Sequence, residues 1–407
     1  MSGLRRALTS LLLLTCACQA IQLPLPATPA PTPSRPTPAA VADAPLPATR
    51  GEAGVADEGL LTALYERVAP AVVAISVYAA PGDTMGQKRG SGFLMDAMGH
   101  IVTNAHVIRD AARLEVVFHD GRIAPAALRG ADGASDLALL QVDAAAVAGL
   151  SSLVLADSDA LRPGQRVVVI GNPFGLNNSM TQGIISATGR QLPPALLTDA
   201  GLPQGFSNPA VLQLDARISS GNSGGPVVNT RGEVIGVATA IRSAGGGFQG
   251  VGFAVPANTL RRVAPELIER GSVRYAWLGI STQREEDGFS VAALVEALGL
   301  TTNKGVLIDR VHRDSPAQLA GLRGGSERIM LRGVEVCAGG DIIVAINGHF
   351  VNNLDELLAW LVSYGHPGDE VTLLVVRGEE TLELSLSLGA RPRPGDDLAP
   401  ADCADGP

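Results

Sequence analysis

The sequence predicts a mostly β protein built around two packed antiparallel barrels. Short segments rich in β-branched residues alternate with loops rich in Gly, Asp and Asn, at the spacing typical of barrel strands. Glycine is abundant, at 48 residues, whereas aromatic residues make up only 3% of the chain. With 407 residues, the chain has room for about two or three domains with buried cores.

Composition and charge exclude several classes of partner. The formal net charge is −9, and the only lysines are Lys88 and Lys304. No basic patch therefore predicts binding of nucleic acid. No His/Cys/Asp cluster has metal-ligand spacing and no phosphate-binding loop occurs, so we expect neither a metal nor a cofactor.

Residues 1–20 are typical of an export signal. Arg5 and Arg6 precede a short apolar run from Ala7 to Thr15, which is too short to span a bilayer. Cys16 and Cys18 follow this run and resemble the lipid-modified cysteine of bacterial lipoproteins. Lipid attachment would anchor the exported protein to the membrane, and ordinary cleavage after Ala20 stays open as the alternative.

Residues 21–57 form a linker rich in Pro, Ala and Thr. Such a segment cannot bury enough apolar surface to offset the entropy of ordering, and its prolines favour an extended chain. We expect a tether between the cell envelope and a folded body that begins near residue 58.

The folded body begins with apolar residues at helical spacing, from Leu60 to Tyr65, followed by a strand-like run from Val68 to Tyr78. The remaining strands are expected at 92–95, 100–103, 114–118, 137–142, 166–171, 183–189, 211–215, 226–229, 233–240 and 250–255. After them, a linker helix within 257–274 is expected to be capped by Asn258, kinked or broken at Pro265 and stopped at Gly271.

Gly221-Asn222-Ser223-Gly224-Gly225-Pro226 carries the chemistry of the chain. A serine between glycines on a tight turn suits nucleophilic attack, because a substrate carbonyl can approach the main-chain N–H groups. Serine needs a general base and a group that orients the base. His106 and Asp136 are the candidates, unless His106 is a satisfied core histidine and Asp136 merely caps a turn. The order His106, Asp136, Ser223 is that of chymotrypsin-like proteases.

The shared motifs together resemble the HtrA (Deg) family of envelope serine proteases, over roughly residues 58–390. The matching segments are 90–93, 103–107, 135–138, 170–175, 221–226 and 252–256. The resemblance implies a chymotrypsin-like double β-barrel over 58–256, in which His106 and Asp136 come from the first barrel and Ser223 from the second.

The oxyanion hole is expected in the backbone of Gly221, Asn222 and Ser223, with the N–H groups of Gly221 and Ser223 as donors. Asn222 is neutral and cannot form the ion pair that activates trypsin-like zymogens. Control should therefore come from rearrangement of loops, for which 189–209 and 243–250 are candidates.

The resemblance also places the primary substrate pocket. Its expected lining is Ile218 and the segment Val237-Ala238-Thr239. An aliphatic wall without a carboxylate favours small aliphatic side chains on the acyl side of the scissile bond.

Residues 275–390 resemble a PDZ domain of the permuted bacterial type, an α+β fold with a partly open barrel. The loop Trp277-Leu278-Gly279-Ile280 matches the loop that takes the C-terminal carboxylate of a peptide bound at the sheet edge. An insertion at 324–339 departs from most members. The alternative is a packing module with an occluded groove.

Two cysteines lie outside the signal, Cys337 in this insertion and Cys403 in the tail. An oxidising compartment permits a bridge between them, but the sequence leaves it open. The tail, 391–407, is expected to be disordered. The resemblance further implies a homotrimer joined near the protease N-terminus, where Tyr65 is nearly the only aromatic residue.

The sequence thus predicts an exported serine endopeptidase that degrades misfolded or partly unfolded envelope proteins and binds C-terminal peptides at its PDZ domain. The competing interpretation is a catalytically weak PDZ protein that acts as a chaperone or scaffold.

Overall fold

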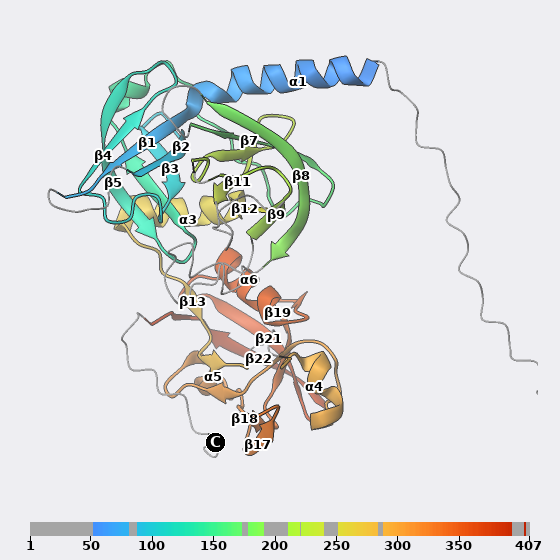
Figure 1. Cartoon of the computed structure of the whole chain (residues 1–407). Helices are drawn as coiled ribbons and strands as arrows, with labels where there is room; N and C mark the ends of the chain where they lie inside the picture. The colour runs from blue at the N-terminus through green and yellow to red at the C-terminus, as the bar shows by residue number, and fades with distance from the viewer. Residues whose placement is uncertain are drawn as a thin grey trace, which may run out of the picture. The chain divides into compact units, whose positions relative to one another are not determined.

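The computed structural model describes residues 52–80, 88–172, 178–190, 211–219, 221–239, 251–283, 288–392 and 403 (Figure 1). The predicted signal with Cys16 and Cys18, most of the linker and most of the two candidate regulatory loops lie outside these residues. No helix within the described ranges is long and apolar enough to cross a membrane.

The first closed barrel has the strand order β1-β2-β3-β6-β5-β4. A helix, α1 (Glu52–Val68), and a 3₁₀ turn, η1 (Ala69–Ala71), precede it, so the helix starts six residues before the predicted folded body. The strands are β1 (Val72–Tyr78), β2 (Lys88–Leu94), β3 (His100–Asn104), β4 (Arg113–Val117), β5 (Ile123–Asp132) and β6 (Leu137–Gln141), followed by η2 (Ala144–Val147). The predicted strand from Val68 begins only at Val72 because the 3₁₀ turn, with its proline, occupies the residues between.

The second closed barrel has the order β10-β11-β12-β9-β8-β7. Its strands are β7 (Arg166–Gly171), β8 (Ser179–Arg190), β9 (Val211–Leu214), β10 (Pro226–Val228), β11 (Val234–Thr239) and β12 (Gly252–Pro256). The two closed barrels confirm the predicted double-barrel fold.

The linker helix α3 (Ala257–Arg270) differs from the prediction at both its start and its middle. Its N-cap is Pro256, and the Asn258 side chain instead donates a hydrogen bond to Asp157 at 2.8 Å. Pro265 lies inside one continuous helix, so of the predicted kink or break the break does not occur. Gly271 ends the helix in the left-handed conformation, at φ +73°, as expected of a glycine stop.

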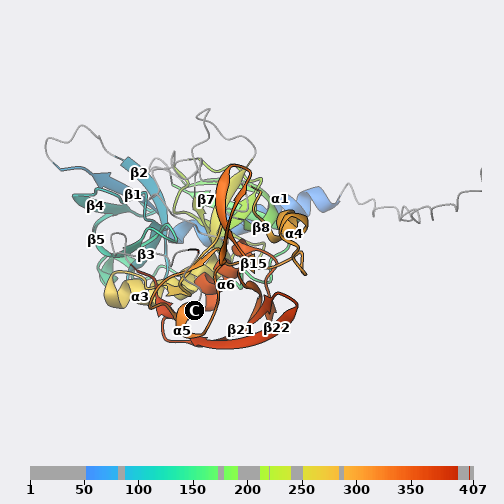
Figure 2. The ribbon, with the colours of Figure 1, turned by 90° about the horizontal axis from the view of Figure 1, so that it is seen from below.

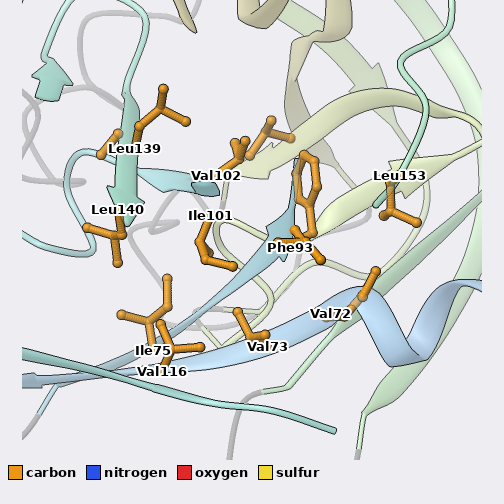
Figure 3. Close-up of a cluster of buried hydrophobic side chains, with 14 of the residues drawn as sticks. Val72, Val73, Ile75, Phe93, Ile101, Val102, Val116, Leu139, Leu140 and Leu153 are labelled. Carbon is orange, nitrogen blue, oxygen red and sulfur yellow. The ribbon is translucent and has the colours of Figure 1, made fainter. Parts of the chain in front are cut away.

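The main apolar core fills the first barrel and continues into the second and onto α3. Figure 3 shows Val72, Ile75, Phe93, Ile101 and Leu140 among the side chains that meet there, and each of them is at most 1% exposed. The two barrels share this core, because Val237 and Val255 of the second barrel belong to the same cluster as the side chains of the first.

The C-terminal domain is an α+β fold around the sheet β15-β19-β21-β22. The adjacent strands β21 and β22 are visible side by side in Figures 1 and 2. Its helices are α4 (Val291–Leu298), α5 (Pro316–Leu319) and α6 (Leu354–Tyr364). Its strands are β13 (Ala276–Trp277), β14 (Ile280–Ser281), β15 (Val306–Leu307), β16 (Arg310–Val311), β17 (Glu327–Leu331), β18 (Val334–Ala338), β19 (Ile342–Ile346), β20 (His349–Phe350), β21 (Glu370–Arg377), β22 (Glu380–Ser387) and β23 (Gly389–Ala390).

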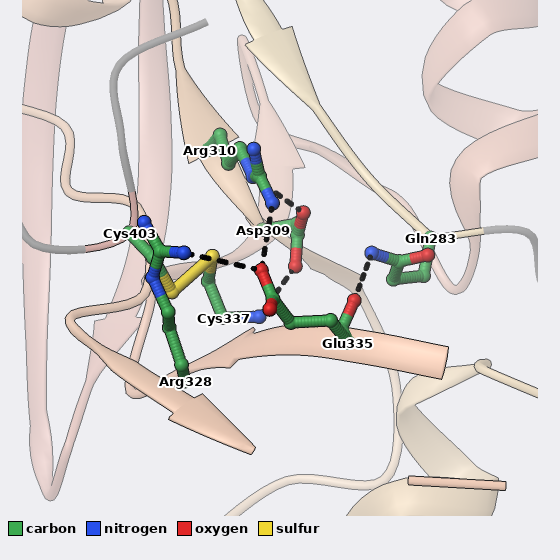
Figure 4. Close-up of a disulfide and its surroundings, with 7 residues drawn as sticks. All are labelled: Gln283, Asp309, Arg310, Arg328, Glu335, Cys337 and Cys403. Atoms are coloured by element: carbon green, nitrogen blue, oxygen red, sulfur yellow. Dashed lines mark hydrogen bonds and ion pairs between the residues drawn. A yellow bond between two sulfur atoms is a disulfide. The ribbon is translucent and has the colours of Figure 1, made fainter. Parts of the chain in front are cut away.

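A disulfide joins Cys337 on the inserted hairpin β17–β18 to Cys403 in the tail (Figure 4). The two Cα atoms lie 5.5 Å apart, within the range that a disulfide requires, and both side chains are buried. Next to it, the Cys337 N–H donates to Asp309 at 2.8 Å. The pairing that the sequence left open is therefore present, and Cys403 is a fixed point in a tail predicted to be disordered.

Candidate active site

His106 and Asp136 meet at one end of the first barrel. His106 follows β3 and Asp136 precedes β6, and these two strands pair directly, with Asn104 opposite Leu137. The His106 Nδ1 lies 2.8 Å from Oδ2 and 3.0 Å from Oδ1 of Asp136, and the His106 N–H donates to Oδ1 at 3.0 Å. A carboxylate that is 3% exposed thus holds an imidazole that is 18% exposed.

Asp136 adopts the left-handed conformation, at φ 54°, in the turn before β6. This conformation is uncommon for a residue other than glycine, so neighbouring contacts must hold it. The Asp136 carbonyl accepts from the Ala105 N–H at 3.1 Å and from the Asn104 side chain at 2.9 Å. These contacts hold the backbone of the turn, and the Asp136 carboxylate extends from it to His106.

Buried polar groups also hold Ser135, the residue before Asp136 in this turn. Asp132 Oδ2 accepts from the N–H and the hydroxyl of Ser135, at 2.7 and 2.6 Å, and from the phenol of Tyr275 at 2.5 Å. Burial beside the Asp132 charge raises the pKa of Tyr275 well above its ordinary value of 10, so the phenol stays protonated and donates.

Thr239 also contacts the Asp136 carboxylate. Its hydroxyl, 103 residues away in sequence, donates to Asp136 Oδ2 at 3.0 Å. The residue predicted to line the substrate pocket thus has its hydroxyl bonded to Asp136. Strand periodicity predicts on which face of β11 the residue lies but gives no information about a partner in the other barrel.

Ser223 lies on a hydrogen-bonded turn before β10 and is 1% exposed. The Asn222 N–H donates to the Ser219 carbonyl and the Gly225 N–H to the Asn222 carbonyl, both at 2.9 Å. Gly224 adopts φ +85° and donates to the Ala238 carbonyl at 2.8 Å. The turn thus needs glycine for its conformation.

The nucleophile turn packs directly on the strands that lead to His106. The Ser223 carbonyl accepts from the Ser91 N–H at 2.8 Å. A Cβ on Gly224 would lie 2.1 Å from the Ser91 carbonyl oxygen and 3.2 Å from the Asn104 N atom, two residues before His106. The structure therefore brings all three predicted catalytic residues to the same junction between the barrels.

The Asn222 side chain lies next to Gly171 of β7, and the Ser179 hydroxyl donates to its Oδ1 at 3.4 Å. It is 3% exposed, and a Cβ on Gly171 would lie 2.5 Å from its Oδ1. The amide accordingly fills a space next to β7, where no ion pair of the zymogen type is seen among the described residues.

The residues predicted to line the substrate pocket lie around the second barrel. Ile218 is 6% exposed, and its side chain lies against Gly252, where a Cβ would come within 2.9 Å of it. Val237 and Ala238 are fully buried on opposite faces of β11, Val237 in the main core and Ala238 in the core of the second barrel.

The loop Trp277–Ile280, predicted to bind a peptide carboxylate, is held by backbone contacts to the neighbouring residues 312–317. Gly279 adopts φ +90°, and a Cβ there would lie 2.1 Å from the Cβ of Ser315. The carbonyls of Leu278 and Gly279 accept from Ala317 and His312, both at 2.8 Å. Among the described residues, no side chain accepts from the N–H of Leu278 or Gly279.

His312, which follows directly after β16, contacts this loop. Its Nε2 lies 2.9 Å from the Ser281 hydroxyl and its ring lies 5.5 Å from that of Trp277, centroid to centroid. Burial lowers the pKa of His312 from its ordinary value of 6.5. The sequence pattern gave no reason to single out this histidine.

Comparison with known proteins agrees with both parts of the fold. Residues 90–237 match the trypsin-like peptidase domain and residues 276–388 match the PDZ domain. The chain is 37% identical over 314 residues to the probable periplasmic serine endoprotease DegP-like of Marinomonas sp. (strain MWYL1), which covers 77% of this chain and 60% of that protein. The protein of the same name from Ectopseudomonas mendocina (strain ymp) is 36% identical over 321 residues, 79% of this chain and 60% of that one. The chain thus spans about 60% of the length of these two relatives.

Among solved structures, the HtrA-type protease AlgW with tripeptide matches with a TM-score of 0.63 and 33% identity, over 82% of this chain and 98% of that one. The serine endoprotease from Yersinia pestis matches with a TM-score of 0.54 and 29% identity, over 81% and 98%. A trypsin-like domain, a PDZ domain and a match to nearly the whole of an HtrA-type protease show that this chain belongs to the HtrA family of proteases.

Proposed function

We infer that the protein is an exported serine endopeptidase that cleaves misfolded or partly unfolded proteins of the cell envelope. The contact between His106 and Asp136, next to the turn of Ser223, carries this proposal. An extended chain is the natural substrate, because a cleft between two barrels accepts an unfolded segment more readily than a folded surface. The curated relatives, named periplasmic serine endoproteases, support a periplasmic location.

The proposed mechanism follows from the groups at the junction. Ser223 Oγ attacks the peptide carbonyl while His106 takes its proton, and His106 then gives the proton to the leaving amine. Asp136 holds the imidazole tautomer through Nδ1–H and stabilises the imidazolium. The backbone N–H groups of Gly221 and Ser223 are the proposed donors to the oxyanion, and loss of one such donor typically costs ~10²–10³-fold in turnover.

The proposed specificity is for small aliphatic side chains at the position before the scissile bond. Ile218 lies against Gly252, and neither residue offers a charge. The preference is tested with peptides that differ only at that position, and faster cleavage after Lys or Arg than after Val or Ala would contradict it.

The PDZ domain is proposed to bind free C-termini with apolar terminal residues. Its loop Trp277–Ile280 offers backbone N–H groups, and β14 offers an edge on which a peptide strand can add. The AlgW structures with a tripeptide and a decapeptide support peptide binding in this family.

The triad is tested by comparing casein cleavage by the wild type with that by Ser223→Ala. We expect the variant to fold and to lose cleavage. His106→Ala and Asp136→Asn should also be severe, and the three losses should not add, because the residues act as one unit. Cleavage by Ser223→Ala at nearly the wild-type rate would refute the assignment, and a wild type that binds unfolded protein without cutting it would favour a chaperone.

The regulatory role is tested with a C-terminal peptide and its amidated form. Coupling of ~1–3 kcal/mol predicts a several-fold to roughly hundred-fold activation. The amidated peptide should bind more weakly because it lacks the carboxylate. If deletion of residues 275–407 leaves basal activity and the peptide response unchanged, the PDZ domain is not the sensor.

The membrane tether and the assembly are proposals from the sequence. Lipid on Cys16 or Cys18 would anchor the chain through the linker, and mass spectrometry of the protein from a lipoprotein-processing bacterium tests it. An unmodified N-terminus at Ile21 would contradict the tether. A homotrimer is tested by light scattering of the purified protein.

A further inference from the structure

Ser91 joins the first barrel to the nucleophile turn of the second. It lies in β2 and is completely buried. Its hydroxyl donates to the Gly221 carbonyl at 2.7 Å and accepts from the Asn172 N–H at 2.8 Å. Its backbone N–H donates to the Ser223 carbonyl at 2.8 Å, so one residue contacts the peptide groups on both sides of Asn222-Ser223.

These contacts fix the peptide planes around the nucleophile. The C=O and N–H of a peptide point in opposite directions because the unit is planar. Ser91 Oγ holds the carbonyl of the peptide between Gly221 and Asn222, and the N–H of that peptide donates to Ser219. In the next peptide, the Asn222 carbonyl accepts from Gly225, which sets the direction of the Ser223 N–H, the proposed oxyanion donor.

Close packing keeps Ser91 itself in place. The Thr103 hydroxyl donates to the Ser91 carbonyl at 2.8 Å, and this residue lies on β3, the strand that leads to His106. A Cβ on Gly171 would come within 3.0 Å of Ser91 Oγ, and a Cβ on Gly224 within 2.1 Å of the Ser91 carbonyl. The packing thus leaves Ser91 no space for another position, and its hydroxyl stays bonded to the Gly221 carbonyl.

A serine needed only for packing would not explain this pattern of contacts. Alanine would fit the same space, but it would leave the Gly221 carbonyl and the Asn172 N–H buried without this partner. The Gly221–Asn222 peptide would then be held only through its N–H, by Ser219, and could tilt about that bond. A tilt of this peptide would change the direction of the backbone donors next to it.

We propose that Ser91 is a positioning residue of the protease, whose hydroxyl orients the Gly221–Ser223 backbone so that its N–H groups meet the oxyanion. The inference rests on the proposed function, because it assigns a role within the same reaction. Its effect is on the transition state, since the oxyanion forms only there.

The test compares Ser91→Ala with the wild type on a short chromogenic peptide. We expect kcat to fall about 10- to 100-fold with little change in KM, somewhat less than the loss of an oxyanion donor itself. Affinity for a peptide boronate, whose oxygen occupies the oxyanion position once Ser223 adds to boron, should fall in parallel. Affinity for the matching peptide amide, a ground-state analogue, should stay unchanged.

Ser158→Ala is the matched control. Ser158 is also buried and its hydroxyl accepts one backbone N–H, from Asn258 at 3.0 Å, but within the described residues its hydroxyl makes no hydrogen bond to the turn of Ser223. The control should lose stability without the loss of kcat. If Ser91→Ala does not fold, Ser91→Cys, whose thiol donates weakly, should show the same selective loss of kcat and boronate affinity to a smaller degree.

The outcomes separate the two proposals. Equal kcat and boronate affinity in the wild type and the folded Ser91 variant would overturn the role of Ser91 and leave the protease assignment intact. A parallel loss of kcat and of affinity for the peptide amide would also overturn it. A wild type that neither cleaves peptides nor binds the boronate would overturn the proposed function, and this inference with it.

Discussion

Gly224→Ala should disable the protein far more than its size suggests. Gly224 adopts φ +85°, which costs an alanine about 1–2 kcal/mol. In addition, the new Cβ would lie 2.1 Å from the Ser91 carbonyl oxygen and 2.4 Å from the Thr103 hydroxyl. To reach the 3.0 Å below which real Cβ contacts essentially never occur, the turn must move by about 0.9 Å.

A shift of this size acts on Ser223 directly, because the two residues share a peptide bond. A misplacement of about 1 Å costs roughly 10²-fold in rate, so we expect kcat/KM to fall by about that factor. Gly121→Ala is the matched control, since Gly121 has the same φ of +85° but no atom within 4 Å of the new Cβ. It should lose about 1–2 kcal/mol of stability and keep its activity.

Peptide hydrolysis and urea unfolding of both variants provide the assay. If Gly224→Ala retains kcat/KM within about two-fold of the control while both unfold at the same urea concentration, the close contact with Ser91 does not constrain the nucleophile. The reasoning from packing to catalysis would then be wrong.

Three further predictions concern the supporting structure. Tyr275→Phe should lower the free energy of unfolding by about 1.5–3 kcal/mol, because it removes a buried hydrogen bond to the charged Asp132. Tyr78→Phe removes a part-buried hydrogen bond to Glu115 and should lower this free energy less; equal effects would contradict the prediction. Cys403→Ser should destabilise the PDZ domain in thermal unfolding by up to about 4 kcal/mol, since the disulfide closes a loop of 66 residues. A wild-type unfolding transition that is the same under reducing and oxidising conditions would argue against a structural bridge. The folded state disfavours protonation of His312, so its contribution to stability is present above pH 6.5 and is lost as the pH falls through the lowered folded-state pKa. The melting temperature of His312→Gln should therefore depend less on pH in this range, and identical curves for the variant and the wild type would refute it.

Local patterns in the sequence predict most of the strands. β7 has the predicted bounds, Arg166–Gly171, because four consecutive β-branched residues fill both faces of a buried strand. β5 was missed, because only Ala124, Gly130 and Asp132 are buried along its ten residues and the run contains a proline. Apolar periodicity therefore fails to predict a barrel strand when most of its residues are exposed to solvent.

For the candidate site, too, the sequence predicts what local motifs carry and not what depends on contacts between distant residues. His106, Asp136 and Ser223 could be predicted because their residue types, local motifs and order along the chain are visible in the sequence. Ser91, Thr239 and Tyr275 act through partners 130, 103 and 143 residues away, and no local pattern encodes such a contact. The bridge between Cys337 and Cys403 depended likewise on proximity, which only the fold supplies.

The contact between Ser91 and Gly221 also bears on how the chain matures. Because its partners are 130 residues apart and come from different barrels, this contact can form only once both barrels have come together. A first barrel that has folded alone holds His106 and Asp136 but has no nucleophile and no docked turn. If the protein is the protease proposed above, a chain in which only one barrel has folded lacks the complete triad and should not cleave its neighbours.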